Sequence, residues 1–358
     1  MLSCETQLIE FIGNLVNNMQ KGSQTDILVM DLSQALDKVG HKRLARKLEY
    51  YGISGKTNKW IRSFSAGRNQ TVVLDGEKSD PVEVTSGVPQ GSVPRPCLFL
   101  FYINDLPLNL KSTVRLFADD TIAYLTIRNN KDAAVLQEDL DKLAAWEEKW
   151  LMEFHPKKCQ VLNDTRNRKS VEFEYKLHGQ ILEKVTYAKY LSVTITDDLR
   201  WNQHISNITT KANNTLSFLK RNIHVSSPKL KSQVYNTQVR PTLKYAATVW
   251  DPYTERNINK VEMVQRRAAR YVSNRYNNTS SVTCMLKALG WTPLSVWREI
   301  QRLAMLYKIN HGLVAIDKQN FIQPVSKPTR HAHKDGYMIP QSSSDYHLYY
   351  FFPRTVRL

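Results

Sequence analysis

The chain has 358 residues, 42% of them hydrophobic, and its formal net charge at pH 7 is +17. This apolar content is sufficient for a folded core and excludes wholesale disorder, and the length allows about two or three domains. No run of about 18 apolar residues occurs, so we expect no transmembrane helix and no membrane partner. The N-terminus lacks the basic-then-apolar pattern of a secretion signal, which favours an intracellular protein.

The positive charge is concentrated in the second part of the chain. Residues 1–160 contain 20 Lys+Arg and 20 Asp+Glu, whereas residues 161–358 contain 30 and 13. A neutral part followed by a strongly basic part predicts that the second part contacts a polyanion. The alternative is an ordinary solvated basic surface.

In chain order, the first elements are a helix and a buried strand. Apolar residues at helical spacing predict a helix over residues 5–20, with Ser3 as its N-cap. The short stretch 26–30 (DILVM) predicts a buried strand that ends on Asp31, at a strand end where catalytic residues of α/β proteins often lie. The pattern then predicts two helices and one hairpin, over residues 41–51, 55–66 and 70–85.

A glycine-rich loop covers residues 86–92, with the sequence SGVPQGS, and precedes the apolar run 97–103. Glycines allow a ligand to approach the backbone closely. The alternative is a plain loop between a strand and a helix.

Two adjacent carboxylates, Asp119 and Asp120, interrupt the β-prone stretch 114–125. Because Asp is unfavourable inside strands, the pattern predicts a tight hairpin with both acids at its turn. Two like charges beside Phe117 and Ile122 are costly unless a cation lies there, and Mg²⁺ suits one or two carboxylates. The alternative is a solvated turn, where Asp is common.

The remaining pattern is a long helix, several strands and a helical region. We expect a helix over 131–153, strands over 173–195 and helices from about 204 onward, followed by an irregular segment over 322–345. Core candidates in the helical region are Leu216, Leu219, Leu230, Val234, Val239, Val261, Val264 and Ala268. Arg266, Arg267 and Arg270 gather on another face of their helix.

Seven stretches in this order resemble the reverse transcriptases of non-LTR retrotransposons of the LINE and jockey type. They are residues 30–37 (MDLSQALD), 86–92, 101–107 (FYINDLP), 117–120 (FADD), 190–193 (YLSV), 198–205 (DLRWNQHI) and 249–252 (VWDP). The resemblance implies an α+β fold with a right-hand polymerase palm. It implies a palm with residual fingers over 1–195, a basic thumb-like helical region over 196–320 and an irregular C-terminal tail over 321–358.

The resemblance also implies an activity, RNA-directed DNA polymerisation with two Mg²⁺ ions. Its partners would be an RNA template, a DNA primer and deoxynucleoside triphosphates, without an organic cofactor, in the nucleus and cytoplasm. Asp31, Asp119 and Asp120 would bind the metals, which activate the primer 3′-oxygen and stabilise the leaving pyrophosphate. Lys158 matches the residue that protonates the pyrophosphate, although it also fits a solvated lysine.

The resemblance gives further residues roles in binding nucleic acid and nucleotide. Gln90 and Gly91 would position template and nucleotide, Leu36 would lie at the nucleotide sugar, and Tyr190 and Leu191 would belong to the primer grip. Arg266, Arg267 and Arg270 are the candidates for contact with nucleic-acid phosphates.

Several positions depart from the family pattern. Leu36 stands where an aromatic residue usually excludes the ribose 2′-hydroxyl, and Pro94-Arg95 replaces a Leu-Gly pair. If that glycine had positive φ, Arg95 would add about 1–3 kcal/mol of strain. Ser192 replaces a glycine of the primer grip, and Gly40 replaces an aspartate. These changes favour the alternative function, a decayed, inactive fragment that keeps the fold and binds nucleic acid.

The ends of the chain bear on the same alternative. In the family, a basic fingers segment precedes the point at which this chain begins, and an endonuclease lies farther upstream. We therefore expect an N-terminally truncated chain that extends primers poorly by itself.

Overall fold

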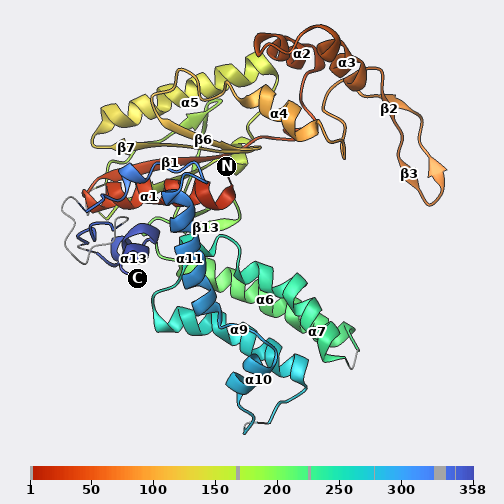
Figure 1. Cartoon of the computed structure of the whole chain (residues 1–358). Coiled ribbons are helices and arrows are strands. Elements are labelled where there is room, and N and C mark those ends of the chain that lie inside the picture. Colours follow the sequence, from red (N-terminus) through yellow and green to blue (C-terminus); the bar gives the residue numbers. More distant parts are fainter. Residues whose placement is uncertain (1–2, 167–169, 225–226, 278, 326–335, 343) are drawn as a thin grey trace. The chain divides into compact units, whose positions relative to one another are not determined.

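The computed structural model describes residues 3–166, 170–224, 227–277, 279–325, 336–342 and 344–358. It divides into two compact units (Figure 1). The first, Ser23–Ala188, is called the sheet unit here, and the second, Met1–Gly22 with Lys189–Leu358, is called the helical unit. These packing units do not coincide with the expected functional domains, since the first 22 residues belong with the C-terminal part. The functional division stays a prediction.

The described residues of the sheet unit form a five-stranded sheet, four α-helices and short strand pairs. Its helices are α2 (His41–Tyr50), α3 (Gly55–Ser65), α4 (Arg95–Ile103), α5 (Asn130–Trp150) and the short 3₁₀ turn η1 (Pro156–Lys158). Its strands are β1 (Gln24–Asp31), β2 (Asn69–Gln70), β3 (Val73–Leu74), β4 (Glu77–Lys78), β5 (Val82–Glu83), β6 (Thr113–Phe117), β7 (Asp120–Ile127), β8 (Gln160–Asp164), β9 (Lys176–Leu177), β10 (Gln180–Ile181) and β11 (Glu183–Val185).

The main sheet has the strand order β11-β8-β1-β7-β6, with β1 at its centre. Strand β1 pairs antiparallel with both β7 and β8, and only the outer pair β11–β8 is parallel. Buried apolar residues of β1 and β7 make near-continuous runs, as expected for strands in the middle of a sheet. The sheet therefore holds the C-terminal end of β1 beside the start of β7.

Helix α5 packs along the sheet (Figure 1). Its apolar stripe of Leu136, Leu140 and Leu143 is buried in the same core as Leu28 and Ala123 of the strands. The side chain of Asn129 caps the helix by accepting hydrogen bonds from the first backbone amides. The predicted helix over 131–153 is confirmed, with an end three residues earlier.

A thin ribbon extends from α3 and is made of β2–β5 (Figure 1). Its tip is the turn at Asp75 and Gly76, where both residues have positive φ, of 50° and 92°. Two successive positive φ values define a type I′ turn, the type that a two-residue hairpin favours. The predicted hairpin over 70–85 is confirmed.

The helical unit is built almost entirely of helices. They are α1 (Cys4–Gln20), α6 (Asn202–Asn222), α7 (Pro228–Val234), the π-helical turn η2 (Tyr235–Val239), the 3₁₀ turn η3 (Arg240–Leu243), α8 (Ala247–Trp250), α9 (Glu255–Ser273), α10 (Val282–Ala288), α11 (Leu294–Asn310), the 3₁₀ turn η4 (Lys318–Asn320), α12 (Asp345–Leu348) and α13 (Phe351–Val356). The hairpin of β12 (Tyr187–Tyr190) and β13 (Val193–Thr196) links the two units along the chain. No helix among the described residues is long and apolar enough to cross a membrane.

Helix α1 packs against the end of the chain. Ser3 caps it as predicted, because its side chain accepts a hydrogen bond from the Thr6 amide at 3.2 Å. The Tyr350 hydroxyl donates to the Ile9 carbonyl, and Phe352 of α13 is fully buried. The expectation of an irregular segment through the last residues is therefore wrong for α12 and α13, whose aromatic side chains add to the core.

Helices α6 and α9 pack against each other in the centre of this unit. The predicted core residues Leu216, Val261 and Val264 are buried, in agreement with their helical spacing. Leu230 is 41% exposed, so its prediction as a core residue was wrong. It lies on the short helix α7, which buries none of its residues.

Candidate active site

The β1–β7 ladder places two carboxylates directly opposite each other. Asp31 ends β1 and Asp120 begins β7, and the two are register partners in the antiparallel pairing. Directly opposed residues have Cα atoms about 4.5–5.5 Å apart and side chains on the same face of a sheet. Residues that are far apart in the sequence thus form one acidic pair.

The third carboxylate lies in the adjoining turn. Phe117 of β6 pairs with Asp120, which leaves Ala118 and Asp119 as the two turn residues, and Ala118 has a φ of 53°. The expectation that both acids occupy the turn is therefore corrected, because Asp120 already belongs to the strand. The structure brings Asp31, Asp119 and Asp120 to one edge of the sheet.

Lys158 joins this edge from a separate segment. Its Nζ lies 3.0 Å from Oδ2 of Asp31, and both side chains are partly exposed, by 61% and 39%. The backbone fixes the approach, because the His155 amide donates to the Asp31 carbonyl at 2.9 Å, just before the turn η1. Lys158 is thus solvent-exposed and paired with Asp31, which fits both its expected role and the alternative of a solvated lysine.

The donor set suits a hard cation such as Mg²⁺. Among the described residues, no group of three Asp, Glu, His or Cys side chains is arranged to hold a metal ion. The opposed pair of Asp31 and Asp120 nevertheless supplies the one or two carboxylates that Mg²⁺ usually takes from a protein, with water and phosphate oxygens as its other ligands. The chemistry of the donors therefore fits Mg²⁺ brought in with a phosphate-bearing ligand.

Asp37 organises the glycine-rich loop. Its Oδ1 accepts hydrogen bonds from Gln90 at 3.4 Å and from Arg95 at 3.1 Å, and its backbone carbonyl accepts one from Ser86 at 2.8 Å. Only glycine fits at Gly87, where a Cβ would lie 2.8 Å from the Asp37 carbonyl oxygen. Sequence reasoning missed Asp37 as a site residue, although it ends the stretch that begins just before Asp31.

Gly91 belongs to this loop, whereas Arg95 follows it and begins α4. Gly91 has a φ of 74° and open space around it, so the backbone there is accessible to a ligand. Arg95 is the first residue of α4 and does not have positive φ, so the strain expected at this position is absent. Its side chain instead forms a partly buried ion pair with Asp37.

Leu36 lies beside the same loop. Its carbonyl accepts a hydrogen bond from the Val88 amide at 3.1 Å, and its side chain packs, half-buried, against the core of the sheet unit. The leucine thus bridges the core and the loop that holds Gln90 and Gly91.

Tyr190 and Leu191 are core residues of the helical unit. The Tyr190 hydroxyl accepts a hydrogen bond from Gln7 at 3.3 Å, and its ring lies edge-on to Phe11. Leu191 is 5% exposed, and its carbonyl accepts from the Tyr245 hydroxyl at 2.9 Å. The exposed residues of this hairpin include Tyr187, Lys189 and Ser192, whereas the two side chains assigned to the primer grip are buried.

The three arginines lie on the solvent-facing side of α9. Arg266 and Arg267 are exposed and Arg270 is half-buried. The Arg267 guanidinium donates to Asn213 of α6 at 3.0 Å, which holds it against its neighbour helix. They lie in the helical unit, whereas the carboxylates lie in the sheet unit.

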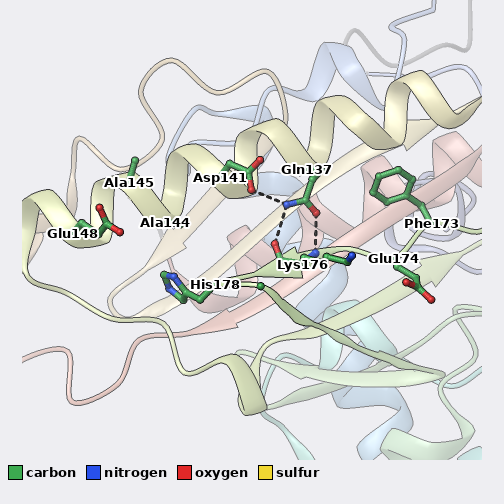
Figure 2. Close-up of a pocket in the computed structure, with 10 residues that line it drawn as sticks. Gln137, Asp141, Ala144, Ala145, Glu148, Phe173, Glu174, Lys176 and His178 are labelled. Atoms are coloured by element: carbon green, nitrogen blue, oxygen red, sulfur yellow. Dashed lines mark hydrogen bonds between the residues drawn. The ribbon is translucent and has the colours of Figure 1, made fainter.

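A groove of about 600 Å³ follows α5, and Figure 2 shows its lining. The Gln137 side chain exchanges two hydrogen bonds of 2.8 Å with the Lys176 backbone and donates a third to Asp141. Gln137 therefore pairs with β9 as a strand residue would, and fastens the helix to it. None of the candidate site residues lines this groove.

Comparison with known proteins assigns the family. Residues 3–195, more than half of the chain, match the family model described as reverse transcriptase (RNA-dependent DNA polymerase). The chain is 30% identical over 268 residues to the probable RNA-directed DNA polymerase from transposon BS of Drosophila melanogaster. This match covers 68% of the chain and 28% of that relative.

Two further relatives are RNA-directed DNA polymerases from the mobile element jockey. The Drosophila melanogaster protein is 30% identical over 68% of this chain and 28% of its own length. The Drosophila funebris protein is 29% identical over 78% of this chain and 32% of its own length. The chain thus spans about three tenths of these relatives.

Among solved structures, telomerase from Candida albicans in complex with a telomeric RNA fragment is similar over 78% of this chain and 49% of that chain. The TM-score is 0.38 and the identity 12%, a similarity too low to bear on the assignment. The family assignment rests instead on the family model and on the jockey-type relatives. The chain belongs to the reverse transcriptase (RNA-dependent DNA polymerase) family and is of the LINE and jockey-like kind.

Proposed function

We propose that this chain performs RNA-directed DNA synthesis, adding deoxynucleotides to a DNA primer along an RNA template. The observation that carries the proposal is the direct opposition of Asp31 and Asp120 in the β1–β7 ladder, with Asp119 in the adjoining turn. Two opposed carboxylates with a third in the adjoining turn concentrate negative charge at one end of the sheet, and this charge favours the binding of cations. A polymerase requires such a centre to bring metal-bound triphosphate to a primer end.

Asp31, Asp119 and Asp120 would hold two Mg²⁺ ions in this proposal. Bound there, the ions would lower the pKa of the primer 3′-hydroxyl and neutralise charge that develops on the triphosphate. The strand ends fix the carboxylates in place, since the register of β1 and β7 leaves little freedom at their backbones. The ion identity and the number of ions are part of the proposal.

Lys158 would donate a proton from its Nζ to the leaving pyrophosphate. Its ammonium lies 3.0 Å from Asp31, and 61% of its side chain is exposed, so it can exchange this partner for a phosphate oxygen. An exposed ion pair of this kind contributes about 1 kcal/mol or less, so the exchange is inexpensive. Lys158 therefore has both the charge and the freedom that a general acid needs.

The loop tied to Asp37 would position the template and the nucleotide. Gly91 leaves its backbone open to a ligand, and the exposed Gln90 side chain holds Asp37 only through a long hydrogen bond of 3.4 Å. Leu36 lies beside the loop, at the place where the nucleotide sugar would bind. The exposed Arg266 and Arg267 would bind nucleic-acid phosphates in the helical unit.

Primer extension on poly-rA/oligo-dT with Mg²⁺ tests the activity of this chain. We expect weak Mg²⁺-dependent extension, in line with the poor extension that the sequence predicts, and Asp119→Asn should lower its rate by roughly two orders of magnitude or more, because metal-based charge stabilisation is worth several kcal/mol. Asp141→Asn is the matched control. It removes one exposed charge on α5 and keeps the oxygen that accepts from Gln137.

A second candidate function is binding of nucleic acid without catalysis. The partly buried ion pair of Arg95 with Asp37 favours it, since this arginine begins α4, directly after the nucleotide-positioning loop, at a position where the family has a glycine. Tight binding of an RNA–DNA duplex by the wild-type chain together with no extension would establish this second function, and recovery of extension in Arg95→Gly would identify Arg95 as the cause. Extension that is lost in Asp119→Asn would exclude it.

A further inference from the structure

A cavity of about 430 Å³ lies in the helical unit, near the C-terminal ends of α6 and α9 and beside α7. Its volume is in the range of small-molecule binding sites. None of the residues assigned a role above lines it. Its lining combines two lysines with two tyrosines, Lys220, Lys231, Tyr271 and Tyr276, and His224 completes one side.

The two lysines concentrate positive charge over one aromatic ring. The Nζ atoms of Lys220 and Lys231 lie 5.9 Å and 5.0 Å from the centre of the Tyr271 ring. Neither ammonium forms an ion pair within the part of the chain that the structure describes. Burial lowers the pKa of Lys220, and the neighbouring Arg267 lowers it further. Binding an anion would relieve this repulsion.

Tyr271 supplies an unused hydrogen-bond donor. The residue is 6% exposed, and its hydroxyl has no partner among the described residues. Burial raises the pKa of this hydroxyl, so it remains protonated and can donate. A buried hydroxyl without a partner is unfavourable by about 1–3 kcal/mol, which an acceptor oxygen of a ligand would remove.

Tyr276 adds an accessible aromatic surface. It is 53% exposed, and apart from Ile223 the other residues that line the cavity are polar or charged. Its carbonyl accepts a hydrogen bond of 3.5 Å from Arg270 of α9, which holds the residue near the helix. An exposed ring beside paired lysines is the combination on which proteins stack the bases of single-stranded nucleic acid.

We propose that this cavity binds one nucleotide unit of single-stranded nucleic acid, with its phosphate against Lys220 and Lys231 and its base on Tyr276. The proposal rests on the proposed nucleic-acid function and adds a site to it. A free phosphate would use the lysines but not the ring. A duplex would present stacked bases whose faces Tyr276 cannot reach.

Binding of fluorescein-labelled ten-nucleotide oligo-dT to the full chain, followed by anisotropy, tests the role of the lysines. Lys220→Gln with Lys231→Gln should weaken binding about tenfold or more at low salt. It should also reduce the slope of log affinity against log salt by about 1.4, for two lost phosphate contacts. The matched control is Lys211→Gln with Lys229→Gln, which removes two exposed lysines from the same helices, α6 and α7.

An abasic strand of the same length has no bases to stack, so comparing it with oligo-dT tests the contribution of the Tyr276 ring. The wild-type chain should prefer oligo-dT to the abasic strand, and Tyr276→Ala should weaken oligo-dT binding by between about fivefold and a hundredfold while leaving abasic binding unchanged. Tyr276→Phe should retain the preference, because stacking does not need the hydroxyl. Circular dichroism of each variant verifies that it is folded.

Two results would overturn this site. One is an equal loss of affinity from both lysine pairs, which would mean diffuse attraction to a basic surface. The other is a Tyr276→Ala variant whose affinities for oligo-dT and for the abasic strand fall by the same factor, which would mean that the site recognises only the phosphates. The proposed polymerase is judged separately by primer extension, so pocket-dependent binding without extension would support this site and contradict that activity.

Discussion

Ser192 holds a backbone conformation that usually requires glycine. It follows Leu191 in the turn between β12 and β13, and the two residues have φ values of 63° and 46°. The left-handed region is unfavourable for residues with a Cβ, by about 1–2 kcal/mol. The serine that replaces the family glycine therefore keeps the turn but weakens it.

Substitution at position 192 should reveal this strain. Ser192→Gly should raise the free energy of unfolding by about 0.5 kcal/mol, since the gain in the turn exceeds the added entropy of the unfolded chain. Ser192→Val should lower it by about 1 kcal/mol or more, because a β-branched residue fits positive φ poorly. Urea denaturation measures both, and a valine variant as stable as wild type would contradict the strained turn.

His204 is a buried neutral imidazole. It is 2% exposed, its Nδ1 accepts a hydrogen bond from the Thr194 amide at 3.2 Å, and its ring lies 5.2 Å from that of Trp250. Burial lowers its pKa to about 4. Its ordinary value in the unfolded chain is about 6.5.

This shift makes the helical unit sensitive to acid. Between pH 6.5 and 4 the unfolded chain binds a proton that the folded chain does not, so stability falls as the pH falls, by about 3 kcal/mol over the whole window. When the pH is lowered from 7.5 to 5, the free energy of unfolding of the wild type should fall by about 2 kcal/mol more than that of His204→Gln. The glutamine amide can still accept a hydrogen bond from Thr194. Parallel losses in urea denaturation at the two pH values would exclude His204 as the cause.

At the scale of elements, α1 shows how one glycine allows close packing. A Cβ at Gly13 would lie 2.5 Å from Cε1 of Phe321 and 2.5 Å from the Tyr350 hydroxyl oxygen. Replacing a glycine inside a helix by alanine normally stabilises the helix by about 0.5–1 kcal/mol. At Gly13 the aromatic neighbours are rigid, so the same replacement should destabilise the protein.

Gly13→Ala should therefore lower the free energy of unfolding by about 1–3 kcal/mol, the usual effect of overpacking a core. A double-mutant cycle with Tyr350→Phe separates the contact with the Tyr350 hydroxyl from the contact with Phe321. Without the hydroxyl oxygen, the alanine should be tolerated better than the sum of the two single changes suggests. Additive effects, or a stabilising Gly13→Ala, would mean that α1 does not pack on these rings.

The same elements show what the sequence could predict. Local signals sufficed for α1 with its Ser3 cap, for the strand ending on Asp31 and for the hairpin at Asp75-Gly76, because capping, burial and turn chemistry act over a few residues. The pairing of Asp31 with Asp120 depends on strand register between distant segments, which no local pattern specifies. The resemblance to a family supplied that link.

Other features were beyond local reasoning for the same reason. The ion pair of Lys158 with Asp31 depends on how the segment after α5 returns to β1. The role of Asp37 depends on three partners from the glycine-rich loop. The helix α13 was missed because Pro and Ser in the preceding segment indicated irregular structure, whereas burial of Phe351 and Phe352 orders the end of the chain.

At the scale of the whole molecule, the proposed catalytic carboxylates and the basic residues proposed to bind nucleic acid belong to different units. The opposed carboxylates lie in the sheet unit, whereas the basic arginines of α9 and the lysine–tyrosine cavity lie in the helical unit. The first 22 residues and the last part of the chain fold together, so removing either end should disturb the whole helical unit. Catalysis in this account requires that nucleic acid held by one unit reach the carboxylates of the other.

Metal binding tests the central claim most directly, because it does not require turnover. Free Mn²⁺ is measured by electron paramagnetic resonance while it is titrated into the full chain with an RNA template, a dideoxy-terminated DNA primer and the next deoxynucleotide. We predict that Asp31→Asn and Asp119→Asn each weaken Mn²⁺ binding by about tenfold or more, and that Asp141→Asn binds as wild type does. Wild-type affinity in Asp31→Asn would contradict the account, because the opposed carboxylates would then not be the metal site.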